Sequence, residues 1–426
     1  MTDRSDRSDR SDPTDRTAAS TSEPFACSRA AWASSLLPAM FSSRLPHSPT
    51  PNALSDQLAR LRERRIPYVD LTESNPTRVG LAYPPDLLQP LADAASLVYE
   101  PAPLGLPAAR QAVAGDFRRR GVPIDPQHIV LTASTSEAYA LLFKLLCNPG
   151  DRVAVPVPSY PLFEYLTRLE GVEVDTYALE YDGAWEVNFE SLRCALTART
   201  RAVLVVSPNN PTGSVLARRE VERFAALCAE RELALIGDEV FADYPLRPRA
   251  EAARSVLDQE CALTFSLGGL SKSAGLPQVK LAWIGLGGPP PLVARALEGL
   301  ELICDTYLSV STPVQQAAEA LLGRGGEIRD RIAARTRANL DRLQSVAARY
   351  PACRLLAPEA GWYAVLQLPA TRSEEEMVLD LLERDRILVH PGYFFDFPRE
   401  AFLVVSLLPP EAPFGDAVER LLARLG

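Results

Sequence analysis

Residues 267–288 read LGGLSKSAGLPQVKLAWIGLGG, and they contain Lys272 and Lys280, two of only three lysines in the chain. Lysine and arginine together number 45, so the sequence uses arginine for nearly all of its positive charge. A lysine amine can lose its proton and condense with an aldehyde, whereas a guanidinium stays protonated and cannot. Lys272 follows the apolar run 262–267, which is typical of a buried strand. The stretch therefore predicts a chemically active lysine just beyond the end of a strand.

Seven short apolar or β-branched runs recur along the chain, and amphipathic helix patterns such as 135–147 and 217–231 lie between most of them. Strands this uniformly apolar are typical of a sheet that is covered on both faces, and such sheets are mostly parallel. The sequence thus predicts an α/β fold with a mostly parallel seven-stranded sheet. The seven predicted strands are 128–132, 152–157, 172–177, 201–207, 233–239, 262–267 and 280–286.

The pattern changes after residue 288, where long helical segments come first and two further strands follow. This mixture predicts a second, smaller α+β domain. The predicted helices after residue 288 are 289–306, which still belongs to the large domain, and 312–322, 326–349, 373–384 and 411–425; the predicted strands are 362–368 and 402–407.

The first fifty residues differ in composition from the rest. The repeat DRSDRSDRSDPTDR alternates charges and has nothing to bury, so we predict that it is disordered. The predicted organisation is a disordered tail with an N-terminal arm, the N-terminal part of a small domain, a large domain, and the C-terminal part of the small domain. The corresponding residues are 1–50, 51–83, 84–310 and 311–426.

Bulk composition excludes several classes of protein. A formal net charge of −9 argues against a nucleic-acid-binding surface, which needs a basic excess. No uninterrupted apolar run reaches the length of a membrane-spanning helix. Seven scattered cysteines and three isolated histidines favour neither a disulfide framework nor a metal site. We therefore expect a cytoplasmic protein that binds neither nucleic acid nor membrane.

Polar residues follow several of the predicted strands. Ser134, Thr135 and Ser136 open the helix after 128–132, where free N–H groups and hydroxyls would suit a phosphate. Taken alone, they are more simply explained as ordinary helix caps. Asn210 lies in the turn after 201–207, and it too is explained by the turn unless a ligand is near.

Asp238 and Glu239 close the apolar run 233–239, where an acid has to be solvated, hydrogen-bonded or paired with a cation. The carboxyl ends of parallel strands meet at one edge of a sheet, so these groups and Lys272 are expected to converge there. A lysine, a carboxylate, an amide and a phosphate cradle together indicate pyridoxal 5′-phosphate, an aldehyde with a phosphate and a ring nitrogen.

Four motifs carry a resemblance to a known family: YEPAPLGLPAAR at 99–110, SPNNPTG at 207–213, GDEVF at 237–241 and LSKSAGLP at 270–277. In this order and spacing the chain resembles the class I/II aminotransferases, the aspartate aminotransferase-like branch of the fold-type-I pyridoxal-phosphate enzymes. The similarity runs from about residue 54 to the C-terminus. It implies the fold-type-I transferase fold, with a large cofactor-binding domain at 84–310.

The resemblance assigns roles to the residues around the cofactor ring. Lys272 matches the lysine that forms the Schiff base and then moves a proton between the substrate and the cofactor. Asp238 matches the acid that keeps the pyridine nitrogen protonated. Asn210 matches the amide that binds the ring hydroxyl oxygen, and Tyr160 matches the aromatic residue stacked on the ring. Without the resemblance, Tyr160 would be interpreted as a core tyrosine.

Other roles concern the phosphate and the subunit interface. Residues 134–136 match the phosphate cradle, and Lys280 stands where the family usually has an arginine on the phosphate. Tyr99 matches a tyrosine that reaches the phosphate in the neighbouring subunit. The resemblance therefore implies a homodimer with shared active sites.

The sequence departs from the family pattern at several positions. Phe241 replaces a tyrosine that touches the ring oxygen. Gly269 replaces a serine on the phosphate, and Ser271 is the expected compensation. Ser74 stands where the N-terminal substrate loop usually has a glycine, and with Asn75 it is a candidate substrate-binding residue.

The largest departure lies near the C-terminus. Val404 occupies the position where many members have an arginine for the substrate carboxylate, and valine cannot bind a carboxylate. Arg78 is the candidate replacement, set against its interpretation as a solvated surface residue. Arg247 and Arg249 are weaker candidates. His390 is interpreted either as a pocket residue or, preferably, as a structural histidine.

The resemblance implies an aminotransferase that moves an amino group from an amino acid donor to a keto acid acceptor. The same apparatus supports C–S β-elimination or other carbanion chemistry on an unusual substrate, and this remains an alternative. A non-catalytic, cofactor-binding regulator is the alternative from a different class. It would need a DNA-binding segment that the first fifty residues are too short and repetitive to form.

Overall fold

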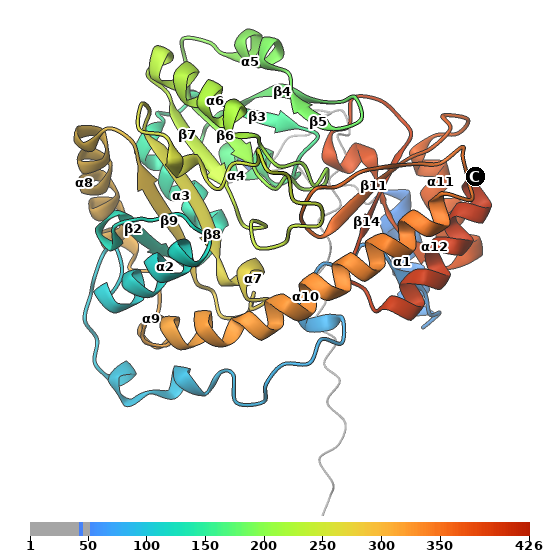
Figure 1. Cartoon of the computed structure of the whole chain (residues 1–426), viewed down its shortest axis with the longest axis horizontal. Helices are drawn as coiled ribbons and strands as arrows, with labels where there is room; N and C mark the ends of the chain where they lie inside the picture. Colours follow the sequence, from blue (N-terminus) through green and yellow to red (C-terminus); the bar gives the residue numbers. More distant parts are fainter. Residues whose placement is uncertain (1–41, 46–51) are drawn as a thin grey trace, which may run out of the picture.

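The computed structural model describes residues 42–45 and 52–426. The predicted disordered tail and arm, residues 1–50, lie outside the described residues apart from 42–45. In the described part, a large sheet and a small sheet lie at opposite ends of the long helix α10 (Ala318–Ala347), as Figure 1 shows. None of the helices there is long and apolar enough to cross a membrane.

The large sheet has eight strands in the order β2-β9-β8-β7-β6-β3-β4-β5. Strands β9 and β5 run in the opposite direction to all the others, which share one direction. The predicted mostly parallel α/β sheet is therefore confirmed. The bounds are β2 (Ile129–Thr132), β3 (Arg152–Val157), β4 (Glu173–Tyr181), β5 (Trp185–Val187), β6 (Thr200–Val206), β7 (Ala234–Asp238), β8 (Thr264–Gly269) and β9 (Ala282–Gly287). The prediction of seven strands was wrong by one, because the three-residue edge strand β5 is too short to give a pattern.

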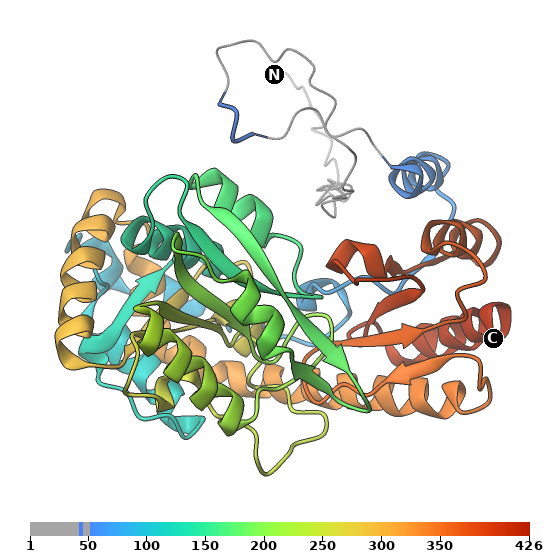
Figure 2. The ribbon, with the colours of Figure 1, turned by 90° about the horizontal axis from the view of Figure 1, so that it is seen from above.

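Helices cover both faces of the large sheet (Figure 2), which explains its uniformly apolar strands. One core contains side chains of α3 (Thr135–Leu146), α4 (Phe163–Leu169) and α8 (Pro290–Tyr307). The core on the other face contains side chains of α2 (Pro107–Arg119), α5 (Phe189–Ala195), α6 (Arg218–Arg231) and the first half of α10.

The small sheet is antiparallel, with the strand order β10-β11-β14-β13, and the pair β1-β12 lies apart from it. Its core includes side chains of the second half of α10 and of three further helices. The strands are β1 (Val69–Asp70), β10 (Arg354–Leu356), β11 (Tyr363–Gln367), β12 (Ile387–Leu388), β13 (His390–Pro391) and β14 (Phe402–Ser406); the helices are α1 (Ala53–Glu63), α11 (Glu374–Asp380) and α12 (Glu411–Leu425).

Helix α10 runs without a break, although the sequence predicted two helices separated near residue 324. Three glycines cause the weak helical pattern there, and one of them has a packing reason. A Cβ at buried Gly325 would lie 2.4 Å from the Cβ of Ala274, so glycine lets α10 approach the segment that follows Lys272. Because α10 contributes to both cores, a domain boundary at 310/311 remains a prediction.

Candidate active site

A cavity of about 290 Å³ lies at the carboxyl ends of the central strands, where the large sheet meets β11 of the small sheet. Most of the residues proposed from the sequence line this one cavity. They are Ser74, Ser134, Thr135, Ser136, Tyr160, Asn210, Asp238, Phe241, Ser271, Lys272 and Lys280. These side chains lie together because the carboxyl ends of parallel strands meet at one edge of the sheet.

Lys272 lies in the four-residue helix α7 (Leu270–Ser273), directly after β8. A helix this short cannot satisfy its own C-terminal carbonyls, so other groups have to bind them. The Tyr244 hydroxyl donates to the carbonyl of Lys272, Arg329 Nε donates to that of Ser273 at 2.8 Å, and the Tyr83 hydroxyl donates to that of Gly275 at 2.7 Å. Side chains from three separate segments thus fix the backbone that carries the lysine.

Lys272 lines the cavity, and its amine lies near two aromatic rings. Its Nζ lies 4.9 Å from the ring centroid of Trp362 and 5.6 Å from that of Phe241. Burial lowers the pKa of Lys272 from 10.5 to about 8, and the charge of Asp238 opposes this shift. A depressed pKa increases the fraction of neutral amine, which is the nucleophilic form.

Asp238 ends β7 and is buried, with 8% of its surface exposed. Burial raises the pKa of its carboxyl, while hydrogen bonds from Tyr139 and Val240 oppose the rise. The Tyr139 hydroxyl donates to Oδ2 at 2.7 Å and the Val240 amide donates to Oδ1 at 3.2 Å. A carboxylate held in this way faces the cavity and suits a protonated ring nitrogen. The local sequence pattern contains no sign of Tyr139, which lies 99 positions away from Asp238.

Glu239, the second acid of this pair, has a structural role. It accepts hydrogen bonds from the hydroxyls of Ser255 and Ser266 at 2.9 and 2.7 Å and from the Val256 amide at 2.8 Å. Arg120 lies 3.8 Å from its carboxylate. These partners account for its burial outside the cavity.

The opposite end of the cavity is suited to an anion. The Ser134 hydroxyl caps α3 by accepting from the Glu137 amide at 3.1 Å, and the first N–H groups of the helix have no partner within it. Ser271 and Lys280 line the same cavity. Backbone amides, hydroxyls and an ammonium group together form a favourable site for a phosphate.

Gly269 also lines the cavity, and the structure gives a reason why it is not serine. A Cβ at this position would lie 2.9 Å from the Cβ of Ala282 and 3.1 Å from the carbonyl oxygen of Leu281. Strand β9 therefore passes too close to β8 for a side chain. Ser271 is left as the hydroxyl on this side of the cavity.

We predict that Gly269→Ser lowers the free energy of unfolding by about 1–3 kcal/mol, because the added atoms clash with β9. The matched control is Gly115→Ser in α2, where a Cβ would meet nothing within 4 Å. Urea denaturation of both variants measures the difference. Equal stability of the two variants would show that β9 moves aside at no cost.

Tyr363, at the start of β11, lines the cavity and was not among the residues chosen from the sequence. Its hydroxyl is in hydrogen-bonding contact with Ser74 and Asn210, and burial raises its pKa. The Oδ1 atom of Asn210 is buried and has no protein partner. An acceptor left unpaired in a cavity indicates a ligand position. Only the tertiary fold brings β11 to this point, so no local signal identifies Tyr363.

Tyr99, Asn75 and Arg78 do not line the cavity, and neither does His390. Tyr99 is 69% exposed and borders a different pocket. Asn75 caps a short 3₁₀ helix by accepting hydrogen bonds from the amide and hydroxyl of Thr77 at 3.0 and 2.7 Å. The Arg78 side chain is 53% exposed, and its Nε lies 3.9 Å from the carboxylate of Glu73. A role for Arg78 in carboxylate binding therefore has no geometric support.

The weaker arginine candidates are also accounted for outside the cavity. Arg249 binds the carboxylate of Glu359 at 2.6 Å, and Arg247 donates to the side chain of Gln344. Both belong to the loop beyond Tyr244, on the rim of another pocket.

The shape and chemistry of the cavity fit pyridoxal 5′-phosphate. The helix N-terminus suits the phosphate, and Asp238 suits the ring nitrogen. The unpartnered Oδ1 atom of Asn210 leaves hydrogen-bonding capacity for a ligand in the cavity, and Lys272 lines the same cavity. Tyr160, 39% exposed, supplies an aromatic face.

Comparisons with known proteins agree with this interpretation. The model of the family described as aminotransferase class I and II matches residues 84–421. The glutamate-pyruvate aminotransferase AlaA of Haemophilus influenzae is 25% identical over 375 residues, which cover 86% of this chain and 91% of that protein. The alanine aminotransferase of Mycobacterium tuberculosis strain H37Rv is 29% identical over 327 residues, which cover 74% and 76%.

Solved structures show the same fold. An aminotransferase from Escherichia coli matches with a TM-score of 0.79 at 24% identity, over 91% of this chain and 98% of that one. The alanine aminotransferase from Pyrococcus furiosus matches with a TM-score of 0.78 at 24% identity, over 87% and 97%.

Proposed function

The chain belongs to the class I and II aminotransferase family and is a transaminase, and from this premise we propose that the cavity around Lys272 binds pyridoxal 5′-phosphate and is the active site. The observation that carries the proposal is the placement of Lys272 between the buried carboxylate of Asp238 and the N-terminus of α3 in one cavity. The names of the relatives favour amino transfer over the two alternatives, C–S β-elimination and a non-catalytic regulator.

The bound cofactor supplies an aldehyde and an electron-accepting ring. The protein supplies the remaining parts. Lys272 Nζ, whose pKa burial lowers to about 8, would hold the cofactor through its aldehyde group and would take a proton from the α-carbon of the substrate. Asp238, whose carboxylate Tyr139 holds in place, would stabilise a positive charge on the ring nitrogen. Residues 134–136, Ser271 and Lys280 would hold the phosphate.

We propose an amino acid as the donor and a keto acid as the acceptor. The relatives include enzymes named glutamate-pyruvate, alanine and tyrosine aminotransferases, so the family spans donors of different size and charge. Phe241 leaves the ring oxygen without a phenol at that position. We propose that Tyr363, whose hydroxyl contacts Asn210, supplies a hydroxyl on this side of the ring.

The test is the absorption spectrum of the purified protein with added pyridoxal 5′-phosphate, titrated with individual L-amino acids. A visible band that an amino acid removes and a keto acid restores would support the proposal and identify the donor class. A band that persists without any keto acid while a thiol, ammonia and an oxoacid are released would favour β-elimination. Failure to acquire a band would reject the cofactor assignment.

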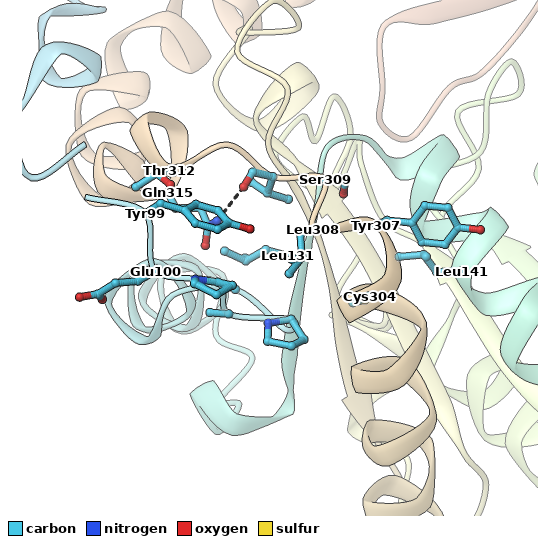
Figure 3. A pocket seen from close by; sticks show the side chains of 15 residues that line it. Tyr99, Glu100, Leu131, Leu141, Cys304, Tyr307, Leu308, Ser309, Thr312 and Gln315 are labelled. Carbon is cyan, nitrogen blue, oxygen red and sulfur yellow. Dashed lines mark hydrogen bonds between the residues drawn. The ribbon is translucent and has the colours of Figure 1, made fainter. Parts of the chain in front are cut away.

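We also propose a homodimer in the cytoplasm. Tyr99 lies in an exposed apolar surface, and Figure 3 shows the pocket that it lines with Tyr307 of α8. Leu97, Val98 and Tyr99 follow one another in the chain and are 88%, 59% and 69% exposed, and on α8 Leu302 and Tyr307 are 73% and 55% exposed. Exposed apolar side chains on two segments that meet in this pocket suit an interaction surface, and a second copy that covers them would bring Tyr99 towards the cavity of its partner.

Light scattering is expected to give a mass twice the 46.5 kDa of one chain. Tyr99→Phe is expected to weaken cofactor binding about tenfold, the effect of one lost hydrogen bond to a charged group, without changing the mass. Tyr307→Phe, which removes a hydroxyl from the same pocket, is the control and should leave cofactor affinity unchanged. A monomer, or a Tyr99→Phe variant with normal affinity, would contradict shared sites.

A further inference from the structure

A second cavity, of about 210 Å³, adjoins three segments of the candidate active site. Ser207 leads into the turn that holds Asn210, Glu239 follows Asp238, and Ala360 precedes β11. Among the described residues, the two cavities have no lining residue in common. The second cavity is therefore a separate space whose walls belong to the same framework.

The walls of this cavity carry an excess of positive charge. Four arginines and two glutamates line it, an excess of two charges in a chain whose formal net charge is −9. We call it the arginine pocket, after Arg120, Arg247, Arg249 and Arg254. Arg247 and Arg254 form no ion pair within the described part of the chain. Their hydrogen bonds go to neutral oxygens, of the Gln344 side chain and the Gly121 carbonyl. No described carboxylate within 4 Å neutralises either of them.

Arg120, at the C-terminal end of α2, is the buried cation of the arginine pocket, with 10% of its side chain exposed. Its Nε atom is buried without a hydrogen bond, and its other guanidinium nitrogens donate to none of the described residues. The carboxylates of Asp116 and Glu239 lie 4.0 and 3.8 Å away, which is too far for a hydrogen bond. The ring of Phe117 packs 4.6 Å from its Cζ atom and helps to hold it in place.

This lack of hydrogen bonds is unusual for a buried guanidinium. The group has five N–H donors, and buried donors in proteins nearly always have an acceptor. Glu239 does not fill this role, because it already accepts three hydrogen bonds from Ser255, Ser266 and Val256. The donors of Arg120 therefore indicate the position of an acceptor that comes from outside the chain.

The rest of the arginine pocket gives the ligand its other property. Much of the remaining wall is apolar and includes Val215, Leu216, Val221, Pro248 and Val256. A guanidinium binds carboxylate or phosphate oxygens through paired N–H groups, and an apolar wall beside it covers an apolar group on the same molecule. The pocket is thus suited to a molecule that has a charged end and an apolar end.

We propose that the arginine pocket binds a small organic anion, a carboxylate or phosphate monoester that carries an apolar group. The guanidinium of Arg120 binds the charged oxygens, and the exposed Arg247 and Arg254 attract the anion to the pocket. Since the walls include neighbours of Asn210 and Asp238, the ligand contacts the framework of the active site without entering it.

The test is isothermal titration calorimetry of the holoenzyme, whose own phosphate site is filled by the cofactor, with phenyl phosphate as the probe. One probe molecule is expected to bind per chain. Arg120→Gln should weaken binding about tenfold or more, the effect of lost hydrogen bonds to a charged group. Arg254→Gln, at an exposed position, should weaken it by a smaller factor.

The matched control is Arg349→Gln, which removes the same charge from an arginine that pairs with Glu419 at 2.9 Å outside the pocket. It should leave the affinity unchanged. The cofactor absorption band of each variant verifies that its fold is intact. If Arg120→Gln does not fold, the comparison of Arg254→Gln with Arg349→Gln still decides whether the probe binds in the pocket.

Further probes define the chemistry of the ligand. Benzyl alcohol lacks the charge and inorganic phosphate lacks the apolar group, so both are expected to bind at least tenfold more weakly than phenyl phosphate. Phenylacetate, compared with phenyl phosphate, distinguishes a carboxylate ligand from a phosphate ligand. Absence of binding by both of these anions would overturn the proposal. So would binding that neither arginine variant weakens, or inhibition that competes with the amino acid donor and persists in Arg120→Gln.

Discussion

Lys272→Met is expected to lower kcat for amino transfer by about 10⁴-fold or more, because it removes both the nucleophile and the group that moves the proton. Single-turnover absorption measurements with the cofactor-loaded variant give the rate. Lys144→Met is the matched control: Lys144 pairs with Glu170 at 2.6 Å, outside the cavity, and its loss should not alter kcat.

The same substitution should not destabilise the fold. Burial lowers the pKa of Lys272 to about 8 from 10.5, so the unfolded chain holds this proton more tightly than the folded protein. The charged amine therefore costs stability below pH 8, and the cost disappears as pH rises from 8 towards 10.5. Lys272→Met is expected to unfold at a urea concentration equal to or above that of the wild type at pH 7. An inactive variant that is also much less stable would mean that the loss of activity reports unfolding.

Asp238→Asn is expected to reduce kcat by about 10³-fold, because a neutral amide no longer stabilises the protonated ring nitrogen when charge develops in the transition state. The amide keeps the size of the carboxylate and still accepts the Tyr139 hydrogen bond. Tyr139→Phe should therefore cost far less, about tenfold, through a poorly held carboxylate. Steady-state kinetics at saturating cofactor measures both.

A matched control for this change is Asp175→Asn, which breaks an ion pair with Arg152 near the start of β4, outside the cavity. It should leave kcat unchanged. If Asp238→Asn kept most of its activity, the proposed pairing of Asp238 with a ring nitrogen would be wrong, although the cofactor assignment itself would stand on the absorption band.

The sequence predicted those parts of the fold that depend on local patterns. The strand 152–157 and the helix 411–425 agree with β3 and α12 in every residue, because long apolar runs and strong amphipathic periods leave little choice. The strand-end residues could be grouped because parallel strands present their carboxyl ends at one edge. A short edge strand such as β5 carries too few residues for a period.

Contacts between distant segments could not be predicted in this way. Tyr139 meets Asp238 only because α3 packs on β8 and β9 beside β7, and Tyr363 reaches the cavity only because the small sheet closes over it. The continuity of α10 depends on Gly325, whose helical cost is offset by close packing against Ala274. Conversely, the sequence candidates Asn75 and Arg78 are explained by local contacts made within their own loop.

Helix α10 fixes the spacing between the two domains' contributions to the candidate active site, because it binds the backbone on both sides. In its first half, Arg329 donates a hydrogen bond of 2.8 Å to the carbonyl of Ser273, next to Lys272. In its second half, Asn339 donates hydrogen bonds of 2.8 Å to the carbonyls of Leu407 and Pro409, which follow β14. These two residues are ten positions apart, which is about 15 Å along the axis of an α-helix. Helix geometry thus sets the distance between the segment of Lys272 and the end of β14. One residue inserted between positions 329 and 339 would turn one of the two side chains by about 100° away from its carbonyl.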